Sequence, residues 1–140
     1  MSIEKNKELV IRLTEDFWNA RDIKTIDRFY SPNLVTHSPN DSQDGNFDSF
    51  KKQCIEDFRA FPDLYIVIDD LIAEGDRVVK FWTLNGTHKD EWVGIPATEK
   101  KVVVSGMEIF RIENGKAVET WMVMDLLGML QQLGVIPPLG

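Results

Sequence analysis

The sequence predicts an α+β domain in which a strongly curved, mainly antiparallel sheet forms a cone-shaped barrel packed on three N-terminal helices. Three segments with helical periodicity lie before Pro62. Runs rich in Val, Ile, Trp, Phe and Thr follow, and turn-forming residues separate them. Helices followed by strands are typical of this fold class. A chain of 140 residues is the size of one domain, so we expect residues 1–140 to form a single unit.

Three helices are predicted in the first part of the chain. Residues 3–20 carry apolar side chains at i, i+3 and i+4 spacing, which indicates an amphipathic helix. Residues 22–30 predict a shorter helix that begins at Asp22, a preferred N-cap residue. Residues 47–60 predict a third helix whose buried face is mostly phenylalanine, and Pro62 follows its end.

The remaining chain alternates between extended runs and turns. Asn114-Gly115 between two such runs is a strong hairpin signal. Residues 126–134 predict a short helix closed by Gly134. Extended segments are predicted at residues 34–37, 64–73, 77–87, 101–112 and 117–124.

The hairpin at Asn114-Gly115 also predicts a register. A bulged turn pairs Met107 with Val123 and Ser105 with Asp125. We expect the face that carries these residues, together with Ile109 and Trp121, to point inward, because the other register places Glu108 on the buried face. A sheet curved around helices encloses an apolar cavity, which is the expected ligand site.

Composition and motifs exclude several function classes. The net charge is −7 and the basic residues are dispersed, which argues against a nucleic-acid partner. No apolar stretch approaches the ~20 residues of a membrane helix, so we expect a soluble, cytoplasmic protein with no membrane partner. Cofactor motifs are missing, and His37 and His88 lie far apart in the sequence. We therefore expect no cofactor and no metal, and chemistry limited to proton transfer.

Asp125 is the candidate catalytic acid or base. It follows the apolar run at 121–124 and precedes an apolar helix, and a desolvated carboxyl suits proton transfer near neutral pH. Position alone favours the alternative that Asp125 is the N-cap of that helix. A cap would bond backbone N–H groups, whereas a catalytic carboxyl would point into the cavity.

Other candidates are polar or aromatic residues that could contact a small hydrophobic molecule. His37 ends a short extended segment and could reach the cavity mouth, although a structural hydrogen bond is the commoner role. Tryptophans could stack on a flat ligand, and core packing is their commoner use. The predicted substrate-binding residues are Trp18, Trp82, Met107, Trp121, Val123 and His88. An exposed sheet face rich in Trp and Met could also bury itself against a second copy, so we expect a homodimer.

Five segments together resemble the SnoaL-like polyketide cyclase (ester cyclase) family, within the nuclear-transport-factor-two-like superfamily. They are DLIAEGDRV at 70–78, GTH at 86–88, GIPAT at 94–98, IFRIENGK at 109–116 and LLGMLQQLG at 126–134. The resemblance implies an α+β cone with a deep pocket. It also implies a cofactor-independent enzyme, because cyclases of this family use the aspartate of a Trp-x-x-x-Asp strand as acid/base in an aldol closure.

The segment WMVMD at 121–125 matches that pattern, so the resemblance gives Asp125 the catalytic role. Asp125 would remove a proton from an activated carbon, and pocket donors such as His37 would steady the enolate. The alternative is a non-catalytic module that binds an apolar ligand or assembles as a dimer. Met107 and Met122 favour it because they make the pocket poor in polar groups, and an Asp125 bonded to backbone amides would favour it as well.

Overall fold

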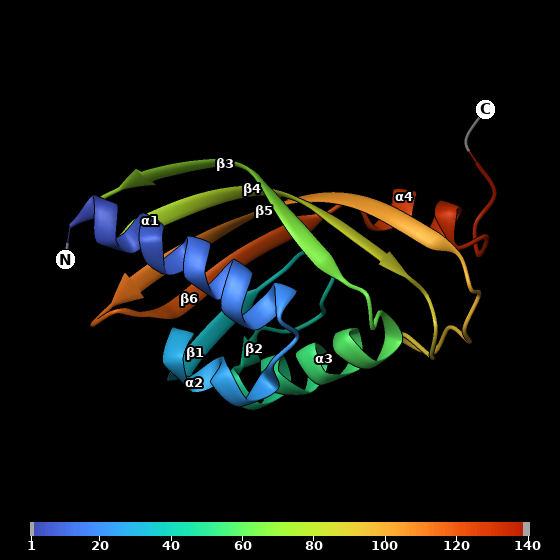
Figure 1. The fold of residues 1–140 in the computed structure, drawn as a ribbon, viewed down its shortest axis with the longest axis horizontal. Helices are drawn as coiled ribbons and strands as arrows, with labels where there is room; N and C mark the ends of the chain where they lie inside the picture. The colour runs from blue at the N-terminus through green and yellow to red at the C-terminus, as the bar shows by residue number, and fades with distance from the viewer. Residues whose placement is uncertain (1, 139–140) are drawn as a thin grey trace.

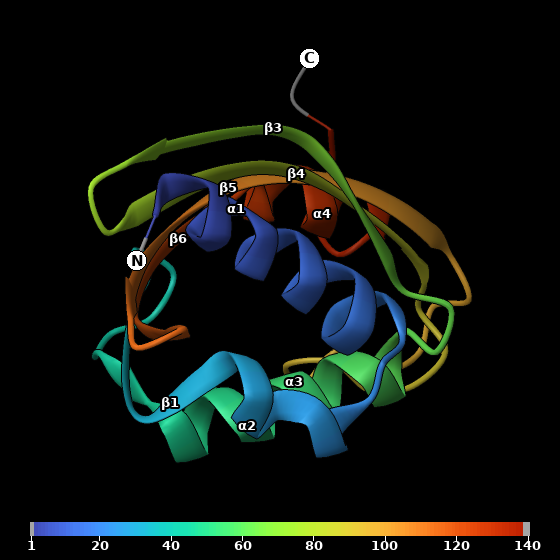
Figure 2. The ribbon, with the colours of Figure 1, turned by 60° about the vertical axis from the view of Figure 1, so that its left-hand side comes forward.

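A six-stranded, strongly curved sheet wraps around helices in this computed structural model, which describes residues 2–138 (Figure 1). The strand order is β2-β1-β6-β5-β4-β3. The sheet arches over α1, and α2 and α3 lie on the opposite side of the interior (Figure 2). The predicted α+β class is confirmed. The sheet stays open, with β2 and β3 as its edges, and does not close into a barrel.

The N-terminal helices follow the predicted pattern with two local changes. Helix α1 (Ile3–Arg12) continues into the π-helical segment η1 (Leu13–Asn19), so the predicted helix changes its hydrogen-bond spacing midway. The predicted second helix is a 3₁₀ turn, η2 (Ile23–Thr25), followed by the short α2 (Ile26–Phe29). π-Helical segments often occur at functional sites. Here η1 turns Thr14 and Trp18 toward the interior.

The next elements form the mouth of the interior. Strand β1 (Tyr30–His37) begins directly after α2 and is longer than predicted. Strand β2 (Gly45–Asn46) was not predicted. Helix α3 (Phe47–Ala60) has the predicted bounds, and Asn46 and Ser49 cap its start reciprocally.

The long strands are β3 (Tyr65–Glu74), β4 (Arg77–Thr87), β5 (Lys101–Glu113) and β6 (Lys116–Met124), each antiparallel to the next. Helix α4 (Leu126–Gln132) follows, and the Gln132 amide bonds both the N–H and the C=O of Val103 on β5. Strand β1 pairs in parallel with β6, which the sequence analysis did not predict. This pair sets His37 beside Trp121.

The predicted register is confirmed, because Met107 pairs with Val123 and Ile109 with Trp121. The predicted facing is wrong. Met107 is 44% exposed and Val123 is 50% exposed, so this face points outward. Glu108 lies on the opposite face of β5, which points inward. This face can be buried with a carboxyl on it because Glu108 lines a cavity and is not part of the close-packed core.

Two groups of buried side chains fill the interior. One lies under α1 and η1 and includes Phe17, Tyr30 and Phe110. The other lies toward α4 and includes Phe61 and Trp82. Trp18 packs against both groups. No helix within the described residues is long and apolar enough to cross a membrane.

Candidate active site

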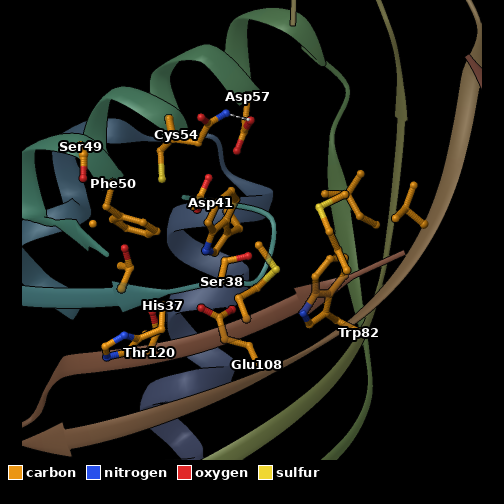
Figure 3. Close-up of a pocket in the computed structure, with 18 of the residues that line it drawn as sticks. His37, Ser38, Asp41, Ser49, Phe50, Cys54, Asp57, Trp82, Glu108 and Thr120 are labelled. Atoms are coloured by element: carbon orange, nitrogen blue, oxygen red, sulfur yellow. Dashed lines mark hydrogen bonds between the residues drawn. The ribbon is translucent and has the colours of Figure 1, made fainter. Parts of the chain in front are cut away.

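A cavity of about 430 Å³ lies between the inner face of the sheet and α3 (Figure 3). Its mouth is formed by the polar segment 38–44 between β1 and β2. No three His, Cys, Asp or Glu side chains within residues 2–138 are grouped to hold a metal ion. Most of the inner wall is aromatic, thioether or aliphatic, and it includes Trp18, Phe50, Phe61, Leu64, Ile66, Trp82, Leu84, Trp92, Val104, Met122, Met124 and Met129.

Glu108 and Lys80 lie at directly opposed positions of β5 and β4. Both line the cavity. Burial raises the pKa of Glu108 to about 7, and the nearby ammonium of Lys80 opposes this shift. Burial lowers the pKa of Lys80 to about 8, while Glu108 acts in the other direction.

Asp57 reaches the cavity from α3, on the wall opposite Glu108 (Figure 3). Its Oδ1 accepts hydrogen bonds from Gln53 Nε2 and from Trp92 Nε1, both at 2.9 Å. Desolvation raises the pKa of Asp57 to about 6, although the hydrogen bonds from Gln53 and Trp92 lower it in part. Two carboxyls that titrate close to neutrality therefore face one apolar space.

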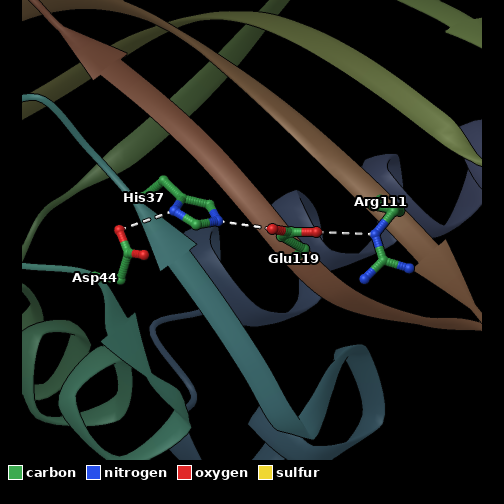
Figure 4. Close-up of polar contacts among 4 residues, drawn as sticks. All are labelled: His37, Asp44, Arg111 and Glu119. Atoms are coloured by element: carbon green, nitrogen blue, oxygen red, sulfur yellow. Dashed lines mark hydrogen bonds and ion pairs between the residues drawn. The ribbon is translucent and has the colours of Figure 1, made fainter.

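His37 lies at the rim of the cavity and bridges two carboxylates (Figure 4). Its Nδ1 lies 2.9 Å from Asp44 Oδ1, and its Nε2 lies 2.7 Å from Glu119 Oε2. Glu119 also accepts from Arg111 Nε at 3.0 Å. The hydrogen bond to Glu119, and then the one to Asp44, raise the pKa of His37. Since both ring nitrogens are engaged, His37 has no free N–H for a ligand in this arrangement.

Asp125 does not line the cavity. It is exposed at the start of α4, where its Oδ1 accepts from the backbone N–H of Gly128 at 2.9 Å. This is the N-cap geometry that sequence position alone favours. The family resemblance implies that Asp125 lies in the cavity. The structure places it outside, because the end of β6 turns this side chain outward.

The other predicted residues divide between the two faces of the sheet. Trp18 and Trp82 line the cavity as predicted. Trp121 lies on the outer face, stacked on His37 with ring centroids 5.3 Å apart. Met107 and Val123 share that outer face and do not reach the cavity.

His88 is fully buried outside the cavity wall, so it is not a ligand contact. Its ring stacks on Phe61, with centroids 5.4 Å apart, and its Nδ1 lies 3.0 Å from the hydroxyl of Thr98. The residue holds the segment after β4 against the loop before β5. Its role in the fold is to close this end of the interior.

Sequence reasoning missed Asp57, Lys80 and Glu108. Each left a signal, because each is a charged side chain at a position whose periodic neighbours are apolar. Asp57 lies three residues after Cys54 on the apolar face of α3, and Lys80 and Glu108 occupy inward positions of their strands.

The sequence matches the SnoaL-like polyketide cyclase family over residues 8–133. The chain belongs to this family. No curated protein matches the sequence. Among solved structures, the SnoaL-like chain is similar to AclR from Streptomyces galilaeus, a proposed hydroxylase, with 29% identity and a TM-score of 0.89 over 99% of this chain and 87% of that one.

Two similar structures are proposed polyketide cyclases. One, from Acidithiobacillus ferrooxidans, is 30% identical, with a TM-score of 0.80 over 96% of this chain and 99% of that one. The other, IdmH from Streptomyces antibioticus, is 26% identical, with a TM-score of 0.80 over 92% of this chain and 98% of that one. Both likenesses span almost the whole fold, the cavity walls included.

Proposed function

We propose that this protein is a cofactor-independent enzyme that moves protons on a small hydrophobic carbonyl compound, in an aldol-type cyclisation or an isomerisation. The observation that carries the proposal is the pair Asp57 and Glu108, two desolvated carboxyls on opposite walls of one apolar cavity. Membership of the SnoaL-like polyketide cyclase family supports the same chemistry.

The two carboxyls differ in environment, and this difference suggests their roles. Asp57 has the lower pKa and acts as the base that removes a proton from a carbon next to a carbonyl. Glu108 has the higher pKa and acts as the acid that donates its proton to the carbonyl oxygen. In a cyclisation, the enol carbon attacks a second carbonyl in the same molecule, the enol O–H proton returns to Glu108, and the new alkoxide takes the proton held by Asp57. In an isomerisation, Asp57 delivers that proton to another carbon of the enol, and the O–H proton again returns to Glu108. Aromatic and thioether walls orient the chain and exclude water that would quench the enol.

These roles predict a bell-shaped pH dependence of kcat/KM. Activity rises with pH as Asp57 loses its proton at about 6, and falls as Glu108 loses its proton at about 7. Asp57→Asn removes the acidic limb and Glu108→Gln removes the alkaline limb. Each change lowers the rate by roughly 10²- to 10⁴-fold, the usual contribution of one general acid or base.

The partial reaction can be measured before the natural substrate is known. A panel of aromatic and polyketide-like ketones in D₂O reports removal of the α-proton as deuterium incorporation, followed by mass spectrometry across pH 5 to 9. Asp125→Asn is the matched control, because this exposed carboxyl lies outside the cavity. The proposal is wrong if Asp125→Asn abolishes exchange while Asp57→Asn and Glu108→Gln leave it intact.

A non-catalytic binding module is the second candidate, and one observation favours it. Asp125 accepts a hydrogen bond from a backbone amide and does not line the cavity, as expected if the aspartate of the Trp-x-x-x-Asp pattern has no catalytic role in this chain. This candidate predicts tight binding of apolar ketones with no deuterium exchange in the wild-type protein. Exchange that depends on Asp57 and Glu108 would contradict it.

We also propose a homodimer formed through the outer face of the sheet. The exposed side chains Val67, Met107 and Val123 support it, together with Trp121 beside them. Contiguous apolar side chains on an exposed surface commonly mark protein interfaces.

A further inference from the structure

We propose that Lys80 is a further catalytic residue whose ammonium, with the carboxyl of Glu108 opposite it, forms a subsite for a negatively charged oxygen such as that of an enolate or phenolate. This inference rests on the proposed function, because it concerns the oxygen to which Glu108 donates. It goes beyond that function in naming the group that stabilises the charge.

The first observation is the position of Lys80. It is 1% exposed and is the only buried lysine or arginine among residues 2–138. Within the described part of the chain, it is also the only lysine or arginine that lines the cavity. Burying an unpaired ammonium is costly, so a lysine at this position requires compensation from a partner.

The second observation is that its partners within the described structure do not complete its hydrogen bonds. Lys80 Nζ donates to Thr14 Oγ1 at 3.1 Å, and Thr14 is fixed as an acceptor because its own hydroxyl donates to Val10 C=O at 2.8 Å. The ammonium also lies 5.4 Å from the ring centre of Phe110. Two of its three N–H groups find no acceptor among residues 2–138.

The third observation is the state of Glu108. Its carboxyl makes no hydrogen bond and no direct ion pair with Lys80 among the residues that the structure describes, although the two positions are paired across β4 and β5. An oxygen atom between them would accept from the ammonium and from the protonated carboxyl. It would thereby satisfy groups that the protein alone leaves incomplete.

The other titratable groups around the inner cavity are neutral or acidic, so Lys80 is the group that supplies positive charge there. Burial raises the pKa values of the Cys54 thiol and the Tyr30 phenol, so both stay neutral. Asp57 on α3 and Glu108 on β5 are the carboxyls that share the inner cavity. When Asp57 removes the proton from carbon, negative charge develops on the substrate oxygen. Lys80 stabilises this charge while it develops. The proton of Glu108 then moves to the oxygen, which leaves the negative charge on the Glu108 carboxylate, opposite the ammonium of Lys80.

The test uses 2-naphthol as the probe, because its neutral and ionised forms absorb differently. Its binding is followed by quenching of the cavity tryptophans, and the ionised fraction of the bound probe is recorded from pH 6 to 10. A cation close to a bound oxygen lowers the pKa of that oxygen by about one to three units. We therefore expect the acid dissociation constant of bound 2-naphthol to be roughly 10- to 1000-fold larger in the wild type than in Lys80→Gln.

Three further variants keep the result interpretable. Lys80→Arg retains the charge and should keep most of the effect, and Lys80→Met is the second neutral variant in case the glutamine does not fold. Lys101→Met, at the exposed start of β5, is the matched control and should behave as the wild type. Equal ionisation in the wild type and the neutral variants, or failure of the wild type to bind 2-naphthol, would overturn the inference.

The outcomes also separate this inference from the proposed function. The deuterium-exchange measurements on Glu108→Gln and Asp57→Asn test the proposed reaction and do not involve Lys80. If exchange proves independent of both carboxyls while bound naphthol still ionises through Lys80, the oxygen subsite stands and the proposed reaction does not. The opposite pattern overturns the role of Lys80 and leaves the acid/base pair in place.

Discussion

His37 shows how one residue acquires a role from neighbours distant in sequence. The sequence analysis expects a pocket donor or a structural hydrogen bond at this position. In the structure the ring links Asp44, at the cavity mouth, with Glu119 on β6. His37 therefore ties the segment 38–44 to the sheet, and its contribution to stability depends on its charge.

The sign of that dependence follows from the two shifts. The pKa of His37 is raised, so its stabilisation is fully present below the ordinary value of about 6.5 and is lost as pH rises through the raised value. The pKa of Glu119 is lowered, first by the hydrogen bond from His37. Its contribution is present above its ordinary value of 4.5 and is lost as pH falls through the lowered value.

We predict that His37→Gln lowers the free energy of unfolding by about 1 kcal/mol near pH 5.5, with a smaller effect as pH rises above the folded pKa of His37. Thermal unfolding of the wild type and of His37→Gln from pH 5 to pH 9 gives the difference in their free energies of unfolding. The titration of other groups largely cancels in this difference. A difference that stays constant across this range would show that the imidazolium does not hold the bridge.

At the scale of elements, the pairing of β4 and β5 shapes the cavity wall. Gly106 pairs with Trp82, and the indole lies against the glycine. A Cβ added at Gly106 would lie 2.6 Å from Trp82 Cη2 and even closer to its Cζ2. Any side chain at position 106 would collide with the indole where it now lies, so this close approach requires a glycine.

We predict that Gly106→Ala destabilises the protein by about 1–3 kcal/mol, because overpacking forces the indole from its position. It should also weaken binding of apolar ketones, since the displaced ring enters the cavity. Urea unfolding and tryptophan fluorescence report the two effects. Ser105→Ala, at the exposed neighbouring position of β5, is the control and should change neither. Unchanged stability in Gly106→Ala would mean that β5 can move away from Trp82 without cost.

At the scale of the whole molecule, the outer face of the sheet carries apolar side chains on three neighbouring strands. Phe81, Met107 and Val123 follow one another across β4, β5 and β6, and Ile109 and Trp121 form the next row. The sequence analysis places several of these residues in the pocket. Because these side chains face outward, they support the homodimer interface that we propose.

We predict that the wild type is a dimer and that Met107→Asp combined with Val123→Asp gives a monomer, because burying two carboxylates in an apolar interface is costly. Size-exclusion chromatography with light scattering measures the mass. Ile55→Asp on α3 is the control, since this side chain is 44% exposed but lies away from the sheet. A monomeric wild type, or a double variant that remains dimeric, would contradict the proposed interface.

The sequence by itself determined the elements and the family. The bounds of α3, the extent of β4 and the pairing of Met107 with Val123 follow from local periodicity and turn chemistry, which act between residues close in the chain. Trp18 and Trp82, which the sequence analysis predicts as substrate-binding residues, line the cavity. Membership of the SnoaL-like polyketide cyclase family, recognised from five short segments, was confirmed over residues 8–133.

Only the tertiary structure decided which face of the sheet is inside. Alternation along a strand divides side chains into two sets, and the choice between the sets depends on where the helices pack. That choice exposes Asp125 as a helix cap and brings Asp57, Lys80 and Glu108 into one cavity from α3, β4 and β5. A charged residue on an apolar face reads as an irregularity in sequence. It becomes a candidate catalytic group when folding removes water from it and places a second such residue across the same space.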